Sequence, residues 1–131
     1  MATSTIRTIR CSRVNERSPL SAALTLHVTH GHELGRPTVE RVAASYAGDV
    51  LVFGHTHRPI VATRAGNDGR SRLVVNPGAA GPRRFDIEPT VALLTISRWG
   101  PLRLRLFRWR RGVGWGPYAS QLDRKSLDLT W

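Results

Sequence analysis

Cysteine is nearly absent from the sequence, with Cys11 as the single example among 131 residues. One thiol excludes an internal disulfide framework and a zinc site built from cysteines, and it is typical of a reducing, cytoplasmic setting. Long apolar runs are also missing, because no stretch approaches the roughly 18 residues that a membrane-spanning helix requires. We therefore expect a cytoplasmic protein with no membrane partner.

Acidic side chains are few: nine Asp and Glu stand against 20 Lys and Arg, which gives a formal net charge of +11. Such a surplus attracts phosphate or nucleic acid without defining a site for either. The hydrophobic fraction of 40% and the charged fraction of 22% are ordinary for a folded domain. The composition thus predicts one soluble globular domain with an affinity for anions.

The composition changes near residue 22. Residues 1–22 are rich in serine and arginine, and they lack the apolar centre of a secretory signal. We predict a disordered basic leader at residues 1–22, a folded domain at residues 23–111 and a tail at residues 112–131.

The apolar pattern predicts an α/β fold. Four apolar residues at helical spacing indicate one helix, with Pro37 in its first turn and Gly48 as its C-terminal cap. Short β-prone runs precede and follow this helix, and turn-forming residues further on favour antiparallel hairpins. The expected strands are residues 22–28 and 50–53, followed by hairpins that join 60–64 to 71–75 and 91–96 to 102–109.

All five histidines lie between positions 27 and 57, and four of them occupy two glycine-containing loops. His30 and His32 follow the first predicted strand, while His55 and His57 follow the second. Glycines allow tight turns, so these imidazoles can converge on one point. Convergent imidazoles suit Zn, Mn, Fe or Ni. His27 lies on the strand itself and is expected to be structural.

Three ordered motifs carry a family resemblance. They are THGH at residues 29–32, GHTHRP at residues 54–59, and NPG followed by GPRR at residues 76–84. In this order the sequence resembles the calcineurin-like metallophosphoesterases, and within them the small YfcE-type phosphodiesterase branch. The resemblance implies part of an αββα sandwich, and hydrolysis of a phosphodiester or phosphomonoester substrate by a metal-activated water.

The resemblance also implies roles for individual residues. His30 and His55 would bind one divalent metal, of which Mn, Zn, Fe and Ni are the candidates, and His57 the other. His32 would orient the loop without binding the metal itself. No residue is assigned as a direct catalytic group. The implied substrate-binding residues are Asn76, Gly78 and Arg83.

Only the C-terminal half of a complete family member is matched by these motifs. Complete members resemble one another in three further motifs: an initial Asp-x-His, a Gly-Asp whose aspartate bridges both metals, and a Gly-Asn. None of these motifs precedes Ala22. Without a bridging carboxylate, two dications repel each other, whereas one ion on three imidazoles matches the ligand count of catalytic zinc. We expect a truncated or frame-shifted member of the family, for which hydrolysis and inactivity both stay open, and whose uncovered half-sheet favours a homo-oligomer.

Two alternatives stay open. The same fold also serves as a retromer subunit, so the chain could be a non-catalytic binding module. The segment Leu102–Arg111 could instead be a nucleic-acid strip, with Arg103, Arg105 and Arg108 on phosphates and Trp109 and Trp115 stacked on bases. A strand with one buried and one solvated face already explains its alternation, so nucleic acid is not the favoured partner.

Overall fold

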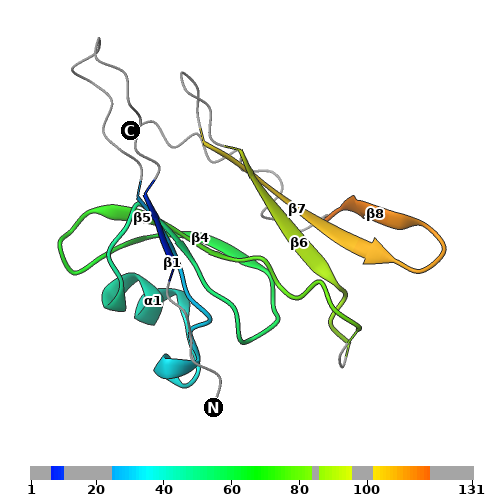
Figure 1. Cartoon of the computed structure of the whole chain (residues 1–131), viewed down its shortest axis with the longest axis horizontal. Coiled ribbons are helices and arrows are strands. Elements are labelled where there is room, and N and C mark those ends of the chain that lie inside the picture. Colours follow the sequence, from blue (N-terminus) through cyan, green and yellow to red (C-terminus); the bar gives the residue numbers. More distant parts are fainter. Residues whose placement is uncertain (1–6, 11–24, 84–85, 96–101, 119–131) are drawn as a thin grey trace, which may run out of the picture. The chain divides into compact units, whose positions relative to one another are not determined.

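The computed structural model describes residues 7–10, 25–83, 86–95 and 102–118 (Figure 1). The chain divides into two compact units, which we call the first unit, residues 1–56 and 60–76, and the second unit, residues 57–59 and 77–131. The described residues form a mixed α/β structure with one α-helix and two sheets, which confirms the predicted fold class.

The first unit contains a five-stranded sheet with the order β1-β2-β3-β5-β4. Strands β2, β3 and β5 are parallel, and the antiparallel strands β1 and β4 flank them (Figure 1). Parallel strands end at the same edge of a sheet, so the residues after β2, β3 and β5 lie along one edge. The bounds are β1 Arg7–Arg10, β2 Thr25–Val28, β3 Val50–Val52, β4 Ile60–Ala65 and β5 Ser71–Asn76.

Strand β1 falls inside the leader that we predicted to be disordered, and that prediction is wrong for these four residues. Arg7 is opposite Val28 and Arg10 is opposite Thr25 in an antiparallel ladder. The backbone of β2 would otherwise present unpaired N–H and C=O groups on this side, and β1 pairs with them. The rest of residues 1–22 lies outside the described residues, and the boundaries of the predicted domain and tail stay predictions.

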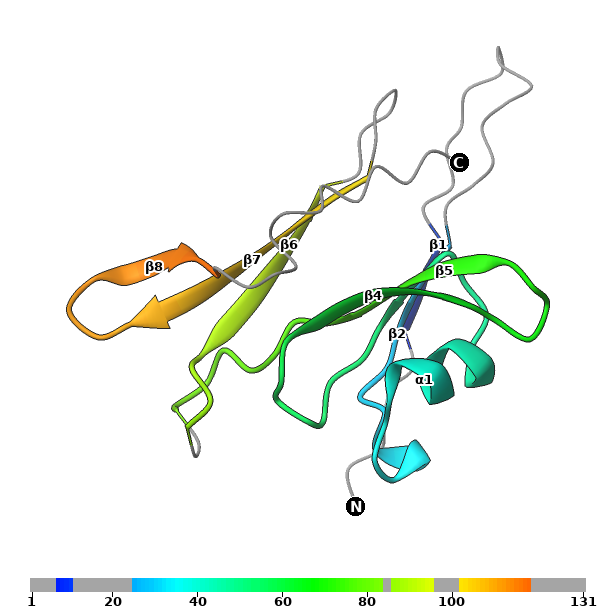
Figure 2. The same ribbon diagram turned by 180° about the vertical axis from the view of Figure 1, so that it is seen from behind.

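The core of the first unit lies between the sheet and helix α1, Val39–Ser45, which packs against β4 and β5 (Figure 2). Helix residues Val42 and Ala43 and strand residues Leu51 and Val74 are at most 1% exposed. A run of apolar residues in β3 is therefore buried as the sequence predicts for a central parallel strand. None of the helices among the described residues is long and apolar enough to cross a membrane.

The predicted ends of the helix are both wrong by one or two residues. Thr38 caps the N-terminus by accepting a hydrogen bond from Arg41 N at 3.3 Å, so Pro37 lies just outside the first turn. Tyr46, in extended conformation, ends the helix before Gly48 is reached. Gly48 instead has a φ of 148° in the turn that leads into β3.

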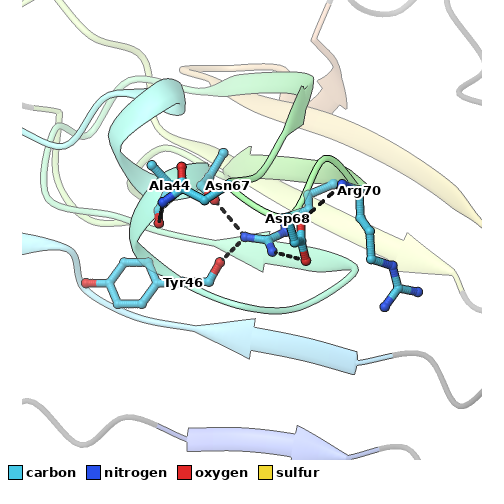
Figure 3. Close-up of polar contacts among 7 residues, drawn as sticks. Ala44, Tyr46, Asn67, Asp68 and Arg70 are labelled. Carbon is cyan, nitrogen blue, oxygen red and sulfur yellow. Dashed lines mark hydrogen bonds and ion pairs between the residues drawn. The ribbon is translucent and has the colours of Figure 1, made fainter.

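Hydrogen bonds from a buried arginine hold the C-terminus of α1 against the sheet. Arg72 of β5 is 7% exposed, and its Nη1 donates to the carbonyl oxygens of Ala43, at 2.7 Å, and Tyr46. Its Nη2 pairs with Asp68 Oδ2 at 2.8 Å (Figure 3). The last carbonyls of a helix have no partner within the helix and attract cations. Arg72 thus supplies the donors that the end of α1 needs.

The second unit contains a three-stranded antiparallel sheet with the order β6-β7-β8. Strands β6, Thr90–Thr95, and β7, Arg103–Arg110, form the second hairpin predicted from the sequence. Strand β8, Gly114–Pro117, pairs with the end of β7 and falls inside the predicted C-terminal tail. The predicted hairpin of β4 and β5 is also confirmed, with Val61 opposite Val75.

Candidate functional site

The two histidine loops lie side by side at the carboxyl ends of β2 and β3. Backbone hydrogen bonds continue the sheet into them: Thr29 N donates to Val52 O at 2.9 Å, and Gly54 N donates to His30 O at 3.2 Å. Gly31 has a φ of 85° and allows the turn from His30 to His32. The first loop is therefore tied directly to the second.

Three imidazole rings meet where these loops meet. The ring centroids of His30 and His55 are 5.0 Å apart, and those of His30 and His32 are 5.2 Å apart. The Nδ1 atoms of His30 and His32 are separated by 3.2 Å. All three side chains are exposed, so a ligand from solvent can reach them. The convergence expected of the histidine loops is thus found for His30, His32 and His55.

The second histidine loop has an unusual backbone. His55 and His57, with φ values of 70° and 59°, are the only non-glycine residues with positive φ in the part of the chain that the structure describes. A left-handed conformation costs a non-glycine residue roughly 1–2 kcal/mol, and such residues cluster at functional sites. His57 belongs to the second unit, so its position relative to the other three histidines is not described.

Asn76 holds the second histidine loop from the end of β5. Its side chain is completely buried, and Nδ2 donates to Gly54 O at 3.1 Å and to Thr56 Oγ1 at 2.9 Å. These bonds lie on either side of His55. Asn76 therefore positions the loop, while contact with a substrate stays a prediction.

Gly78 and Arg83, the other residues predicted to bind substrate, belong to the second unit. Gly78 has a φ of 81°, and a Cβ added there would lie 1.8 Å from Thr90 Oγ1. The glycine thus permits a close approach of this backbone to Thr90. Arg83 is exposed, and Arg84 lies outside the described residues.

Glu33 connects the first histidine loop to the helix, a contact that the sequence did not reveal. Its Oε1 accepts hydrogen bonds from Thr29 Oγ1, at 2.8 Å, and from the hydroxyl of Tyr46. The Tyr46 bond is the largest cause that lowers the pKa of Glu33 to about 2, followed by backbone and Thr29 hydrogen bonds. Its Oε2 lies 3.4 Å from His32 Nδ1. A carboxylate thus flanks the histidine cluster from behind.

His27 is structural, as the sequence predicts. Its ring stacks on Tyr46 with centroids 4.6 Å apart and planes at 28°. Its Nε2 is buried and has no hydrogen-bond partner among the described residues. Burial lowers the pKa of His27, and the nearby charge of Glu33 opposes this effect. The folded protein therefore favours neutral His27.

The change His27→Phe should make stability less dependent on pH. Because the folded pKa lies below the unfolded value of about 6.5, His27 costs no stability above that pH and destabilises the fold as the pH falls through the folded pKa. Phenylalanine keeps the stack on Tyr46 and removes the proton. The measurement is urea unfolding at pH 8 and pH 5 for both proteins. Equal losses of stability in the two proteins would contradict the assignment.

The model of the calcineurin-like phosphoesterase superfamily domain matches residues 9–98. This match covers more than half of the 131 residues, so the chain belongs to the calcineurin-like phosphoesterase superfamily. It confirms the calcineurin-like superfamily that the three motifs predict, and it begins at the third residue of β1, Ile9. No curated protein matches the chain.

Members of this superfamily usually bind divalent metals, so the histidine cluster can be tested for fit. The Nδ1 atoms of His30 and His32 lie within hydrogen-bond distance of each other, at 3.2 Å. No three His, Cys, Asp or Glu side chains in the described ranges are arranged to hold an ion. A full ligand set is therefore not formed by these residues.

Carboxylates do not complete this set in the first unit. Asp49, the first aspartate of the sequence, lies at the amino end of β3, and its Oδ2 accepts a hydrogen bond from Thr25 N at 2.7 Å. The histidines follow the opposite end of the same strand. Glu33 is engaged by Thr29 and Tyr46. The geometry thus supports imidazole ligands and offers no bridge between two ions within the described first unit.

Proposed function

We propose that this chain is a metal-dependent phosphoesterase of the YfcE-type branch, with His30, His55 and His57 as metal ligands. The observation that carries the proposal is the convergence of His30, His32 and His55 on adjacent strand ends. Family membership supports the reaction class, hydrolysis of a phosphodiester or phosphomonoester. Mn, Zn, Fe and Ni all suit imidazole ligands.

A bound divalent ion supplies Lewis acidity and a water of lowered pKa. The chain's own residues do the positioning. Asn76 donates to the backbone carbonyl of Gly54 before His55 and to the side-chain hydroxyl of Thr56 after it, and Gly54 N ties this loop to His30. Glu33 lies behind His32 and orients its ring toward His30. Arg83, exposed in the second unit, is proposed to bind the negative phosphoester.

The test is hydrolysis of bis-(p-nitrophenyl) phosphate by the purified full chain with added Mn²⁺. We expect metal-dependent release of nitrophenolate. His55→Ala removes a proposed metal ligand, so it should reduce this release by more than the roughly 10–100-fold loss caused by changing a residue that only supports a ligand. Calorimetric titration should show that His55→Ala also weakens the binding of Mn²⁺. His27→Phe, which leaves the cluster intact, is the matched histidine control and should retain the rate.

Two results would reject the proposal. Folded chain that binds none of the four metals has no metal site. Folded chain that binds metal but hydrolyses neither aryl phosphodiesters nor monoesters is not an esterase, and the alternative of a non-catalytic binding module would then replace it. An unchanged rate in His55→Ala would assign the hydrolysis to a contaminant.

A further inference from the structure

The two faces of the β6-β7-β8 sheet carry different side chains. Successive residues of a strand point to opposite faces. On one face Leu102 and Leu106 are 4% exposed and Thr90 is 1% exposed, so this face is buried at its centre. We call the opposite one the outward face. On β7 it carries Arg103, Arg105, Phe107 and Trp109.

Aromatic and apolar groups are exposed on the outward face. The strand register places Trp115 of β8 opposite Trp109 and Leu93 of β6 opposite Arg105. Trp109, Trp115 and Leu93 are 43%, 48% and 54% exposed. The two indole centroids are 5.5 Å apart, with planes at 65°. Exposed apolar groups that adjoin one another, as these two indoles do, are a feature of interaction surfaces.

The cations of the outward face have no acidic partner among the residues that the structure describes. Arg103 and Arg105 are exposed, and neither forms an ion pair within the described residues. Arg108, which the sequence grouped with them, points to the opposite face and pairs with Glu88 at 3.4 Å. The segment 102–111 therefore does not form one cationic strip. Two unpaired guanidinium groups and two indoles share one face, in a chain with a net charge of +11.

We propose that the outward face binds single-stranded nucleic acid, with Arg103 and Arg105 on phosphates and Trp109 and Trp115 stacked on bases. Proteins that bind single strands combine a basic surface with aromatic side chains on which bases stack. A duplex hides the faces of its bases and offers mainly phosphates, so it leaves the indoles without partners. An acidic peptide without apolar side chains would satisfy the arginines but not the rings. Figure 2 shows the three strands of this sheet, β6, β7 and β8.

The test is fluorescence anisotropy of a labelled oligothymidylate of about ten nucleotides titrated with the full chain. We expect tighter binding than to a duplex of the same length or to oligoglutamate. Trp109→Leu keeps an apolar side chain but cannot stack, and it should weaken binding about tenfold, whereas Trp109→Phe should retain most of the affinity. Trp115→Leu provides a second variant with the same expectation, and circular dichroism verifies that each variant folds.

Arg105→Gln and Arg108→Gln form a matched pair, because each removes one charge from the same strand on opposite faces. Arg105→Gln should weaken binding, and it should reduce the magnitude of the slope of log affinity against log salt by about 0.7. Arg108→Gln should have a smaller effect on both the affinity and the slope. Equal effects of the pair, or unchanged binding by the folded leucine variants, would overturn the proposal. Oligoglutamate bound as tightly as oligothymidylate would also overturn it, in favour of an acidic protein partner.

Discussion

The change Gly78→Ala is expected to lower the free energy of unfolding by about 3 kcal/mol or more, through three additions to the energy of the folded state. A methyl group would lie 1.8 Å from Thr90 Oγ1, in a region where Thr90 is 1% exposed. Moving that hydroxyl breaks its 2.9 Å hydrogen bond to Pro77 O. Overpacking costs roughly 1–3 kcal/mol, a lost buried hydrogen bond roughly 1–3, and the left-handed backbone roughly 1–2.

Gly112→Ala is the matched control for this experiment. Gly112 has a φ of 78°, close to the 81° of Gly78, and an added Cβ there would meet nothing within 4 Å. This control should lose only the backbone part, about 1 kcal/mol. Adding Thr90→Ala to Gly78→Ala makes room for the methyl group, so the two changes should cost less together than their sum. Urea unfolding measures the wild type, the three single variants and the double variant, and equal losses at Gly78 and Gly112 would refute the steric argument.

The change Asn76→Asp should destabilise the protein by about 3–5 kcal/mol at neutral pH, although the two side chains have the same shape. Asn76 is completely buried and donates to Gly54 O and Thr56 Oγ1. An aspartate would replace these donors with a buried negative charge that faces a carbonyl oxygen. Burial would raise the pKa of the new carboxyl group. The part of the destabilisation that comes from its negative charge is therefore absent below about pH 4 and grows as the pH rises.

Thr56→Val separates the two hydrogen bonds of Asn76. It preserves the shape of Thr56 and removes the acceptor at 2.9 Å, while the bond to Gly54 O stays. We expect a cost of about 1 kcal/mol, well below that of Asn76→Asp. Denaturant unfolding at pH 4 and pH 8 tests both variants. A penalty for Asn76→Asp that does not depend on pH would show that the new carboxyl group is solvated and that Asn76 does not hold the loop.

Local patterns in the sequence predicted the elements that build the candidate site. The apolar run at residues 50–53 and the helical spacing from Val39 onward are properties of neighbouring residues, and β3 and α1 appear where they indicate. The histidine loops were placed after strand ends for the same reason. Each of these predictions depends on a short stretch of chain.

What sequence reasoning missed depends on contacts between distant residues. Strand β1 was missed because its pairing with β2 bridges a change in composition. Tyr46 lies 13 residues from Glu33, so neither its hydrogen bond nor its stack on His27 has a local signal. That stack accompanies the extended conformation in which Tyr46 ends the helix before Gly48. A carboxylate directly after the THGH motif was the one available hint of Glu33.

The guanidinium of Arg72 has a consequence for the order in which the first unit forms. A helix of seven residues is too short to persist in water by itself. Its C-terminal carbonyls receive their donors from β5, and Asp68 in the turn between β4 and β5 holds that donor group. The hairpin is local in sequence and can close first. We therefore expect α1, and with it the anchoring of Glu33 through Tyr46, to form after the closure of a hairpin that carries none of the histidines.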